Sequence, residues 1–181
     1  MTVAALLRVV TQLLDASHIP YMLVGSFASS LHGEPRTTHD LDIVIDPDAS
    51  SLDELLRRVP ERFYVDADVA REALARRSMF NVIDPDTGWK IDLIVRKARA
   101  FSMEELARRG HASIEGVDVR VASAEDTVIA KLEWAKEGGS ARQIDDVRRL
   151  LAVQQTNLDR AYIARWVDEL GLEAQWAEAS Q

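Results

Sequence analysis

The chain has 181 residues, of which 47% are apolar, a formal net charge of −8 and no cysteine. This length suits one domain with a short appendage or two small lobes with a substantial core. No uncharged apolar run approaches the roughly 18 residues of a membrane span, so we expect no membrane partner. The lack of cysteine excludes disulfides, thiol nucleophiles and thiolate metal sites and makes the cytoplasm the default location, while the acidity argues against broad, non-specific nucleic-acid binding.

Hydrophobic periodicity predicts alternating helices and strands in the first part of the chain. Apolar residues recur at helical spacing between Leu6 and Leu14, and short runs rich in β-branched or aromatic residues indicate strands. The segment 51–54, Ser-Leu-Asp-Glu, has the spacing of a capping box and predicts that a helix begins there. The expected elements are a helix over 3–16, a strand over 21–24, a helix over 26–31, a strand over 41–45 and helices over 51–58 and 69–76.

Two β-hairpins are expected next, because turn sequences separate short apolar runs. The first turn reads Asp-Pro-Asp-Thr-Gly and the second Glu-Gly. Between the hairpins, Ser102-Met103-Glu104-Glu105 has capping-box spacing and predicts a helix that Gly110 ends. The expected strands are 79–83 and 89–95 in the first hairpin, and 111–114 and 117–121 in the second.

The character of the chain changes after the second hairpin, where only helices are predicted. They cover 123–137, 143–153 and a third segment that starts at Thr156 and ends at Gly171. Trp134 and the other tryptophans of this part are expected to pack between helices. The fold class is therefore α/β (α+β): a small mixed sheet flanked by helices over residues 1–122, with a C-terminal helical lobe over 123–181 that packs on this core.

Two acids open the strand over 41–45. Asp40 and Asp42 are separated by one residue, so both carboxylates point to one face, whereas Leu41 and Ile43 point to the packed face. Two like charges this close repel each other and resist burial, so folding alone gives little reason to select them. Hard oxygen ligands on a rigid strand suit Mg²⁺, and binding of this ion would explain why two acids lie so close together.

A phosphate site is predicted next to these acids. Gly25 follows an apolar strand and lets a phosphate approach the backbone, and Ser26 can cap the next helix or donate to an anion. Arg36 and Thr38 precede the acids, where they either bind phosphate or serve only as polar loop residues.

A third acid, Asp92, lies inside an otherwise apolar strand, where it is costly unless it is solvated, paired or bound to metal. Placed beside Asp40 and Asp42, it would complete a cluster of three carboxylates. Such a cluster can hold one or two Mg²⁺ ions, clamp a triphosphate and let the third acid deprotonate an attacking hydroxyl.

The pattern of Gly25-Ser26, Asp40-Leu41-Asp42 and Asp92 resembles the nucleotidyltransferase superfamily, which has the DNA polymerase beta-like fold. The resemblance implies a small mixed sheet with the active site at one edge. It also implies transfer of a nucleoside monophosphate from an NTP, usually ATP, to an acceptor hydroxyl, with Mg²⁺ as the cofactor and Mn²⁺ as an alternative.

A narrower resemblance points to the AbiEii-like branch, which includes toxins of bacterial toxin–antitoxin systems. The segment 125–132 looks like the helix that carries a lysine in that branch, here Lys131, and the segment 142–147 looks like its acidic motif, with Asp146 as the matching acid. Gln143 stands where the branch often has an acid. The resemblance implies that Lys131 neutralises triphosphate charge and that Asp146 orients Lys131 or the nucleotide.

The acceptor stays open at this stage between RNA (tRNA in particular), a protein and a hydroxylated small molecule. Arginine clusters over 57–77 and 96–99 are either solvated helix faces or a local basic groove. A cognate toxin or antitoxin is a candidate partner. Two rival functions remain: a binding or antitoxin module of this fold that acts by complex formation without turnover, and a metal-dependent nuclease.

Overall fold

A computed structural model describes residues 1–33 and 40–181 of the chain. The predicted phosphate ligands Arg36 and Thr38 lie outside the described residues. The described strands are β1 (Tyr21–Leu23), β2 (Asp40–Ile45), β3 (Tyr64–Val65), β4 (Met79–Asp84), β5 (Trp89–Val95), β6 (Gly110–Ile114) and β7 (Val117–Val121). The described helices are α1 (Val3–Ala16), α2 (Gly25–His32), α3 (Ala49–Arg58), α4 (Ala67–Arg76), α5 (Ala100–Arg108), α6 (Ala124–Gly138), α7 (Ala141–Gln154), α8 (Arg160–Leu170) and α9 (Glu173–Ala179).

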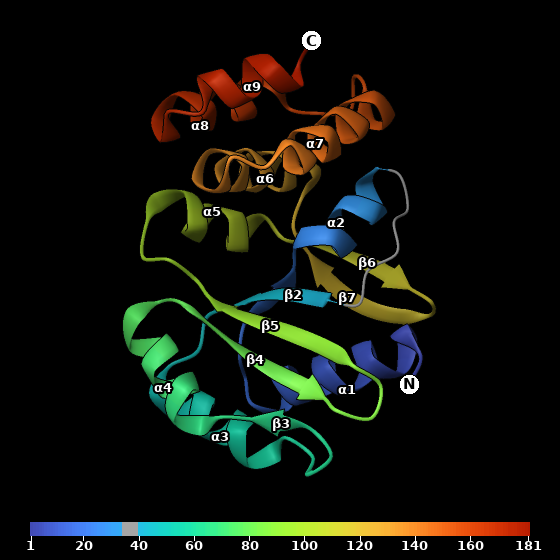
Figure 1. Cartoon of the computed structure of the whole chain (residues 1–181), viewed down its shortest axis with the longest axis vertical. Coiled ribbons are helices and arrows are strands. Elements are labelled where there is room, and N and C mark those ends of the chain that lie inside the picture. The colour runs from blue at the N-terminus through green and yellow to red at the C-terminus, as the bar shows by residue number, and fades with distance from the viewer. Residues whose placement is uncertain (34–39) are drawn as a thin grey trace.

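The strands form one mixed sheet in the order β3-β4-β5-β2-β1-β7-β6 (Figure 1). β2 pairs in parallel with β5 and antiparallel with β1, and both predicted hairpins, β4–β5 and β6–β7, are present. A parallel pair needs a crossover connection, which α3, β3, α4 and β4 supply between β2 and β5. This topology places the predicted acids of β2 and β5 on neighbouring central strands.

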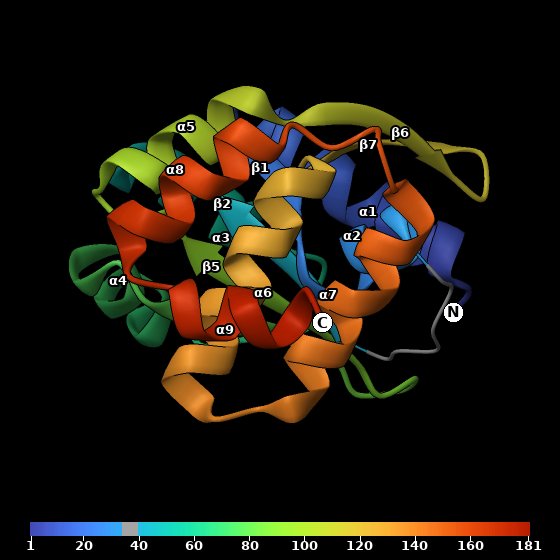
Figure 2. The same cartoon turned by 90° about the horizontal axis from the view of Figure 1, so that it is seen from above.

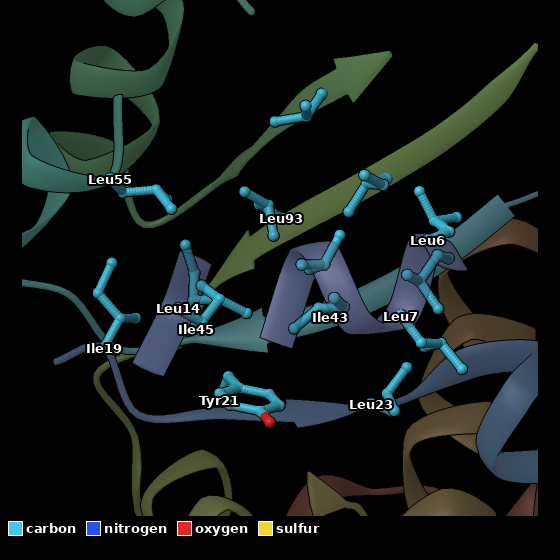
Figure 3. Packing of buried hydrophobic residues seen from close by; sticks show 14 of the residues in the cluster. Leu6, Leu7, Leu14, Ile19, Tyr21, Leu23, Ile43, Ile45, Leu55 and Leu93 are labelled. Atoms are coloured by element: carbon cyan, nitrogen blue, oxygen red, sulfur yellow. The ribbon is translucent and has the colours of Figure 1, made fainter. Parts of the chain in front are cut away.

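The main hydrophobic core fills the face of the sheet covered by α1, α3 and α4. Leucines of α1 and Leu55 of α3 pack on Ile43 and Ile45 of β2 and on Leu93 of β5 (Figure 3). Leu41 is also fully buried on this face. Burying a leucine or isoleucine contributes about 1.5–3 kcal/mol, so this alternation fixes the register of β2 and turns Asp40 and Asp42 to the opposite face, as predicted.

The opposite face is covered in part by α5 and the C-terminal helices. Val44 of β2 packs with Leu106 of α5, and Phe101 of α5 belongs to the same buried cluster as α6, α7, α8 and α9. Figures 1 and 2 show α6 to α9 stacked beyond α5 on this side of the sheet. The boundary at residue 122 remains a prediction, and α5 connects the sheet to the helical cluster.

The starts of α3, α5 and α8 show how the caps differ from the prediction. The capping box of α3 joins Asp48 to Ser51, each side chain accepting from the other residue's backbone N–H, so α3 begins before Ser51. α5 begins after Arg99 without a side-chain cap, which places Ser102 and Glu105 inside the helix. α8 begins after Asp159, whose carboxylate accepts from the Tyr162 N–H at 2.9 Å, rather than at Thr156.

Two short elements, β3 and α9, have no counterpart in the sequence prediction. β3 has two residues and α9 seven, which is too short for either hydrophobic period to be visible. None of the helices described here is long and apolar enough to cross a membrane.

Candidate active site

Asp42 and Asp92 are brought side by side by the parallel pairing of β2 and β5. They are register partners. Two residues earlier on each strand, Asp40 is the register partner of Lys90. Residues in register on adjacent strands point to the same face, so both carboxylates lie on the face opposite the main core. The predicted proximity of the third acid to Asp42 follows directly from this topology.

Asp42 is held in an environment that disfavours its charge. Burial, and then the neighbouring Asp92, raise the pKa of the Asp42 carboxyl, whereas a hydrogen bond from the Ser26 backbone N–H opposes the increase. Desolvation and like charge both penalise an ionised carboxylate. A cation placed between the two acids would relieve both penalties.

Gly25 makes room for Asp42. Its φ is +60°, a left-handed conformation that favours glycine, and an added Cβ would lie 2.1 Å from Asp42 Oδ2. The Val24 N–H also donates to the Asp42 carbonyl at 3.0 Å. The first residue of α2 is therefore packed against the acid, and the backbone amides at the start of α2 lie next to the carboxylate.

Asp92 is positioned by two side chains that the sequence reasoning missed. The Asn81 Nδ2 donates to Asp92 Oδ1 from the register partner position on β4, and Lys90 Nζ lies 3.0 Å from Asp92 Oδ2. Asp92 is only 6% exposed, so these contacts compensate a buried carboxylate. A polar residue at the centre of the apolar strand β4 was the signal available in the sequence.

Asp40 is exposed and lies at the start of β2, beside Lys90 in the register. Within the part of the chain that the structure describes, no three acidic or histidine side chains form a complete metal cage. The close pair is Asp42 with Asp92. Two carboxylate groups still fit Mg²⁺, because this ion is commonly bound by one or two carboxylates together with water and substrate phosphates.

Lys131 is buried, with 5% of its surface exposed, and its Nζ donates to Asp146 Oδ2 at 2.7 Å and to Gln143 Oε1 at 3.0 Å. The contact between Lys131 and Asp146 joins α6 to α7. Gln143, which stands where the AbiEii-like branch often has an acid, thus contacts the lysine through its amide oxygen. Lys131 is therefore a buried residue whose ammonium group is held by α7.

A cavity of about 320 Å³ lies between Asp42 and Lys131. Gly25 and Ser26 of α2, Asp42 of β2, Lys131 of α6 and Gln143 of α7 line it. The rest of the wall comes mainly from β2, β5, the segment 96–99, α5 and α6. Trp134 of α6 also lines it and is 55% exposed, which corrects the prediction that this side chain packs between helices.

The arginine clusters are largely neutralised by acids. On α3 and α4 the partners lie on the same or the adjacent helix: Arg57 and Arg58 pair with Glu54, Arg71 with Asp53 and Asp68, and Arg76 with Glu72. In the second cluster, Arg96 pairs with Asp46 and Arg99 with Glu133. These arginines are therefore partners of acids in the fold, which weakens the case for a basic groove.

The class of the protein follows from its family, and the protein is a nucleotidyltransferase. The family model described as aminoglycoside-2''-adenylyltransferase matches residues 6–150, and the chain belongs to that family. A comparison with curated protein sequences finds no significant match.

Solved structures support the fold. ANT(2")-Ia in complex with adenylyl-2"-tobramycin is similar at 17% identity with a TM-score of 0.59, over 97% of this chain and 99% of that one. An antigenic nucleotidyltransferase-like protein from Paracoccidioides brasiliensis shares 20% identity with a TM-score of 0.55, over 95% and 90%. The lincosamide antibiotic adenylyltransferase LnuA, in its lincomycin-bound form, shares 11% identity with a TM-score of 0.53, over 81% and 95%.

These findings confirm the predicted nucleotidyltransferase fold and the enzyme class. The matched family is not the AbiEii-like branch, so that narrower resemblance stays a hypothesis.

Proposed function

We propose that the protein transfers an adenylyl group from ATP, with Mg²⁺, to a hydroxyl of a small molecule. The observation that carries this proposal is the pair Asp42 and Asp92 in register on β2 and β5, with Asp42 on the wall of a cavity of about 320 Å³. Small-molecule pockets of proteins begin at about this size. The family to which the chain belongs is named for adenylyl transfer to such a molecule.

The divalent cation would be held by Asp42 and Asp92, with Asp40 at the exposed side, and when bound it neutralises phosphate charge and polarises the reacting phosphorus. Mn²⁺ has the same preference for oxygen ligands and is the alternative. Gly25 and Ser26 would offer the backbone amides at the start of α2 to the triphosphate. Arg36 and Thr38 remain predicted phosphate ligands.

The chemical step requires one proton acceptor. The acceptor hydroxyl oxygen forms a bond to the α-phosphorus of ATP while the bond between that phosphorus and the bridging oxygen breaks, and pyrophosphate leaves with that oxygen. The hydroxyl proton passes to the Asp92 carboxylate, which Asn81 and Lys90 hold in place. Lys131, oriented by Asp146, supplies positive charge on the α6 side of the cavity.

A small acceptor is favoured over RNA because the arginine side chains described above are paired with acids and the net charge is −8. A tRNA or protein acceptor in a toxin–antitoxin pair is the second candidate. The buried ion pair of Lys131 and Asp146 supports it, since these are the residues that match the AbiEii-like motif.

The proposal is tested by incubating the protein with α-labelled ATP and Mg²⁺ in separate reactions with small hydroxylated molecules, total RNA and a protein extract. We expect label in the small-molecule reaction, lost in Asp42→Asn and retained in Asp86→Asn, a control in the exposed hairpin turn. Label appearing only in RNA would instead establish the second candidate. Label transfer that is unchanged in Asp42→Asn would refute the proposed site.

A further inference from the structure

Glu105 is a buried carboxyl on the wall of the cavity. It lies on α5, is 6% exposed and faces the same space as Asp42. No hydrogen bond or ion pair to its carboxyl group is found among residues 1–33 and 40–181. A buried carboxyl without a partner is costly to the fold, so a role toward a ligand is the natural explanation for its presence.

The charges around Glu105 make it a poor place for an unaccompanied carboxylate. Burial raises the pKa of Glu105 to about 8, and Asp126 and Glu133 on α6 add to the increase, while Arg99 and Lys97 oppose it. Arg99 does not satisfy Glu105, because its guanidinium donates to Glu133 at 2.6 Å and to Ser102 at 3.0 Å. The surroundings of Glu105 therefore favour a cation.

The other charged groups of the cavity wall have partners. Glu133 pairs with Arg99, and Glu137 has Lys97 at 3.8 Å. Lys131 pairs with Asp146, and Arg96 with Asp46. Apart from Asp42, Glu105 is thus the one carboxyl group on the wall that lacks a paired cation within the described residues.

The remainder of the wall is mainly apolar. Val44, Ile94, Phe101 and Trp134 supply aliphatic and aromatic surface. An acceptor with several ammonium groups would place the additional charges against this surface or against Arg96, Lys97 and Arg99, where they are not compensated. One ammonium group and an apolar body match the wall as a whole.

We propose that Glu105 binds the single ammonium group of the acceptor, which is a hydroxylated small molecule with one basic amine and an apolar body. This inference rests on the proposed adenylyl transfer and narrows its substrate class away from the polycations for which the family is named. A charge-assisted hydrogen bond between Glu105 and the ammonium group, in a partly desolvated site, would make the protein selective for an acceptor with an amine.

The test compares three acceptor probes with ATP and Mg²⁺: lincomycin, with one basic amine, tobramycin, with several, and chloramphenicol, with none. We expect the highest kcat/KM for lincomycin. In Glu105→Gln, the KM for lincomycin should rise about ten- to a hundredfold, the loss expected for one hydrogen bond to a charged group, while the KM for ATP stays unchanged. Glu104→Gln is the matched control, because Glu104 is the adjacent residue on α5 and pairs with Arg165 outside the cavity.

Each outcome separates the two proposals. If ATP with Mg²⁺ neither binds nor reacts, the adenylyl transfer itself is wrong. If ATP binds but lincomycin neither binds nor reacts, or if tobramycin or chloramphenicol is preferred, the inference about the acceptor is overturned and adenylyl transfer is not. A preference for lincomycin that persists in Glu105→Gln overturns the role of Glu105.

Discussion

Asp42 and Asp92 lie opposite each other in the parallel pair of β2 and β5, and the charge of Asp92 raises the pKa of the Asp42 carboxyl. The fold thus maintains a repulsive pair of carboxylates, of which Asp42 lines the cavity. Repulsion of this kind is costly in the free protein and becomes favourable when a divalent cation and a triphosphate bind.

The first prediction concerns these acids. Asp92→Asn should lower adenylyl transfer by about 10²–10⁴-fold, the contribution typical of a lost proton acceptor, and Asp42→Asn should lower it strongly through the loss of a cation ligand. Asp42→Asn should at the same time keep or increase the melting temperature at pH 7, because it removes like-charge repulsion. Thermal unfolding and label transfer measured on the same preparations test both statements. A large loss of stability in Asp42→Asn would contradict them.

Gly25 gives a prediction that separates backbone strain from steric contact. Gly25→Ala should abolish nucleotide binding, because the new Cβ would lie 2.1 Å from Asp42 Oδ2. Gly116→Ala is the matched control: Gly116 also has a positive φ, +75°, but its Cβ would meet no atom within 4 Å. Both variants should lose about 1 kcal/mol of stability from the backbone conformation. If ATP binding falls equally in the two variants, the loss comes from the strained backbone conformation and not from contact with Asp42.

Lys131 and Asp146 give a double-mutant prediction. Lys131→Met leaves the largely buried Asp146 carboxylate without its cation and should cost about 3–5 kcal/mol of stability, whereas Lys131→Met with Asp146→Asn should regain most of it. Activity should stay low in the double variant, because the positive charge of the cavity is still missing. Denaturant unfolding and the KM for ATP are the measurements. Recovery of both stability and activity would assign the pair a purely structural role.

Glu105 gives a prediction about pH. Its pKa of about 8 in the folded protein lies above the ordinary value of 4.5, so the folded state keeps a proton that the unfolded chain releases. The free energy of unfolding should therefore decline as pH rises from about 4.5 to about 8 and be independent of this group below that range. Glu105→Gln should remove this decline, so that its melting temperature exceeds that of the wild type above about pH 7 and approaches it near about pH 5. Glu104→Gln should show no such convergence.

Much of the site could be predicted because its signals are local. The alternation of Asp40, Leu41, Asp42 and Ile43 fixes which side chains face the core, and Gly25 before a short helix indicates a close approach of the backbone. Asp92 was recognisable as an acid inside an apolar strand. The parallel pairing of β2 and β5 then converts these separate signals into one site.

The missed residues depend on contacts between distant elements. Asn81 touches Asp92 only because β4 and β5 pair in a particular register, and Lys90 only because it shares a face with Asp92. Glu105 was read as part of a capping box, but α5 begins after Arg99 and the carboxyl is buried in the cavity. Trp134 was assigned to helix packing by its type, whereas the position of α6 leaves it at the cavity wall.

Calorimetric titration of the protein with α,β-methylene-ATP, with and without Mg²⁺, shows whether Asp42 and Asp92 form a nucleotide site. We expect binding that requires Mg²⁺ and that is lost in Asp42→Asn and in Asp92→Asn but kept in Asp86→Asn. Absence of binding, or binding that is independent of both Mg²⁺ and the two acids, would contradict this expectation and favour a module that acts by complex formation alone.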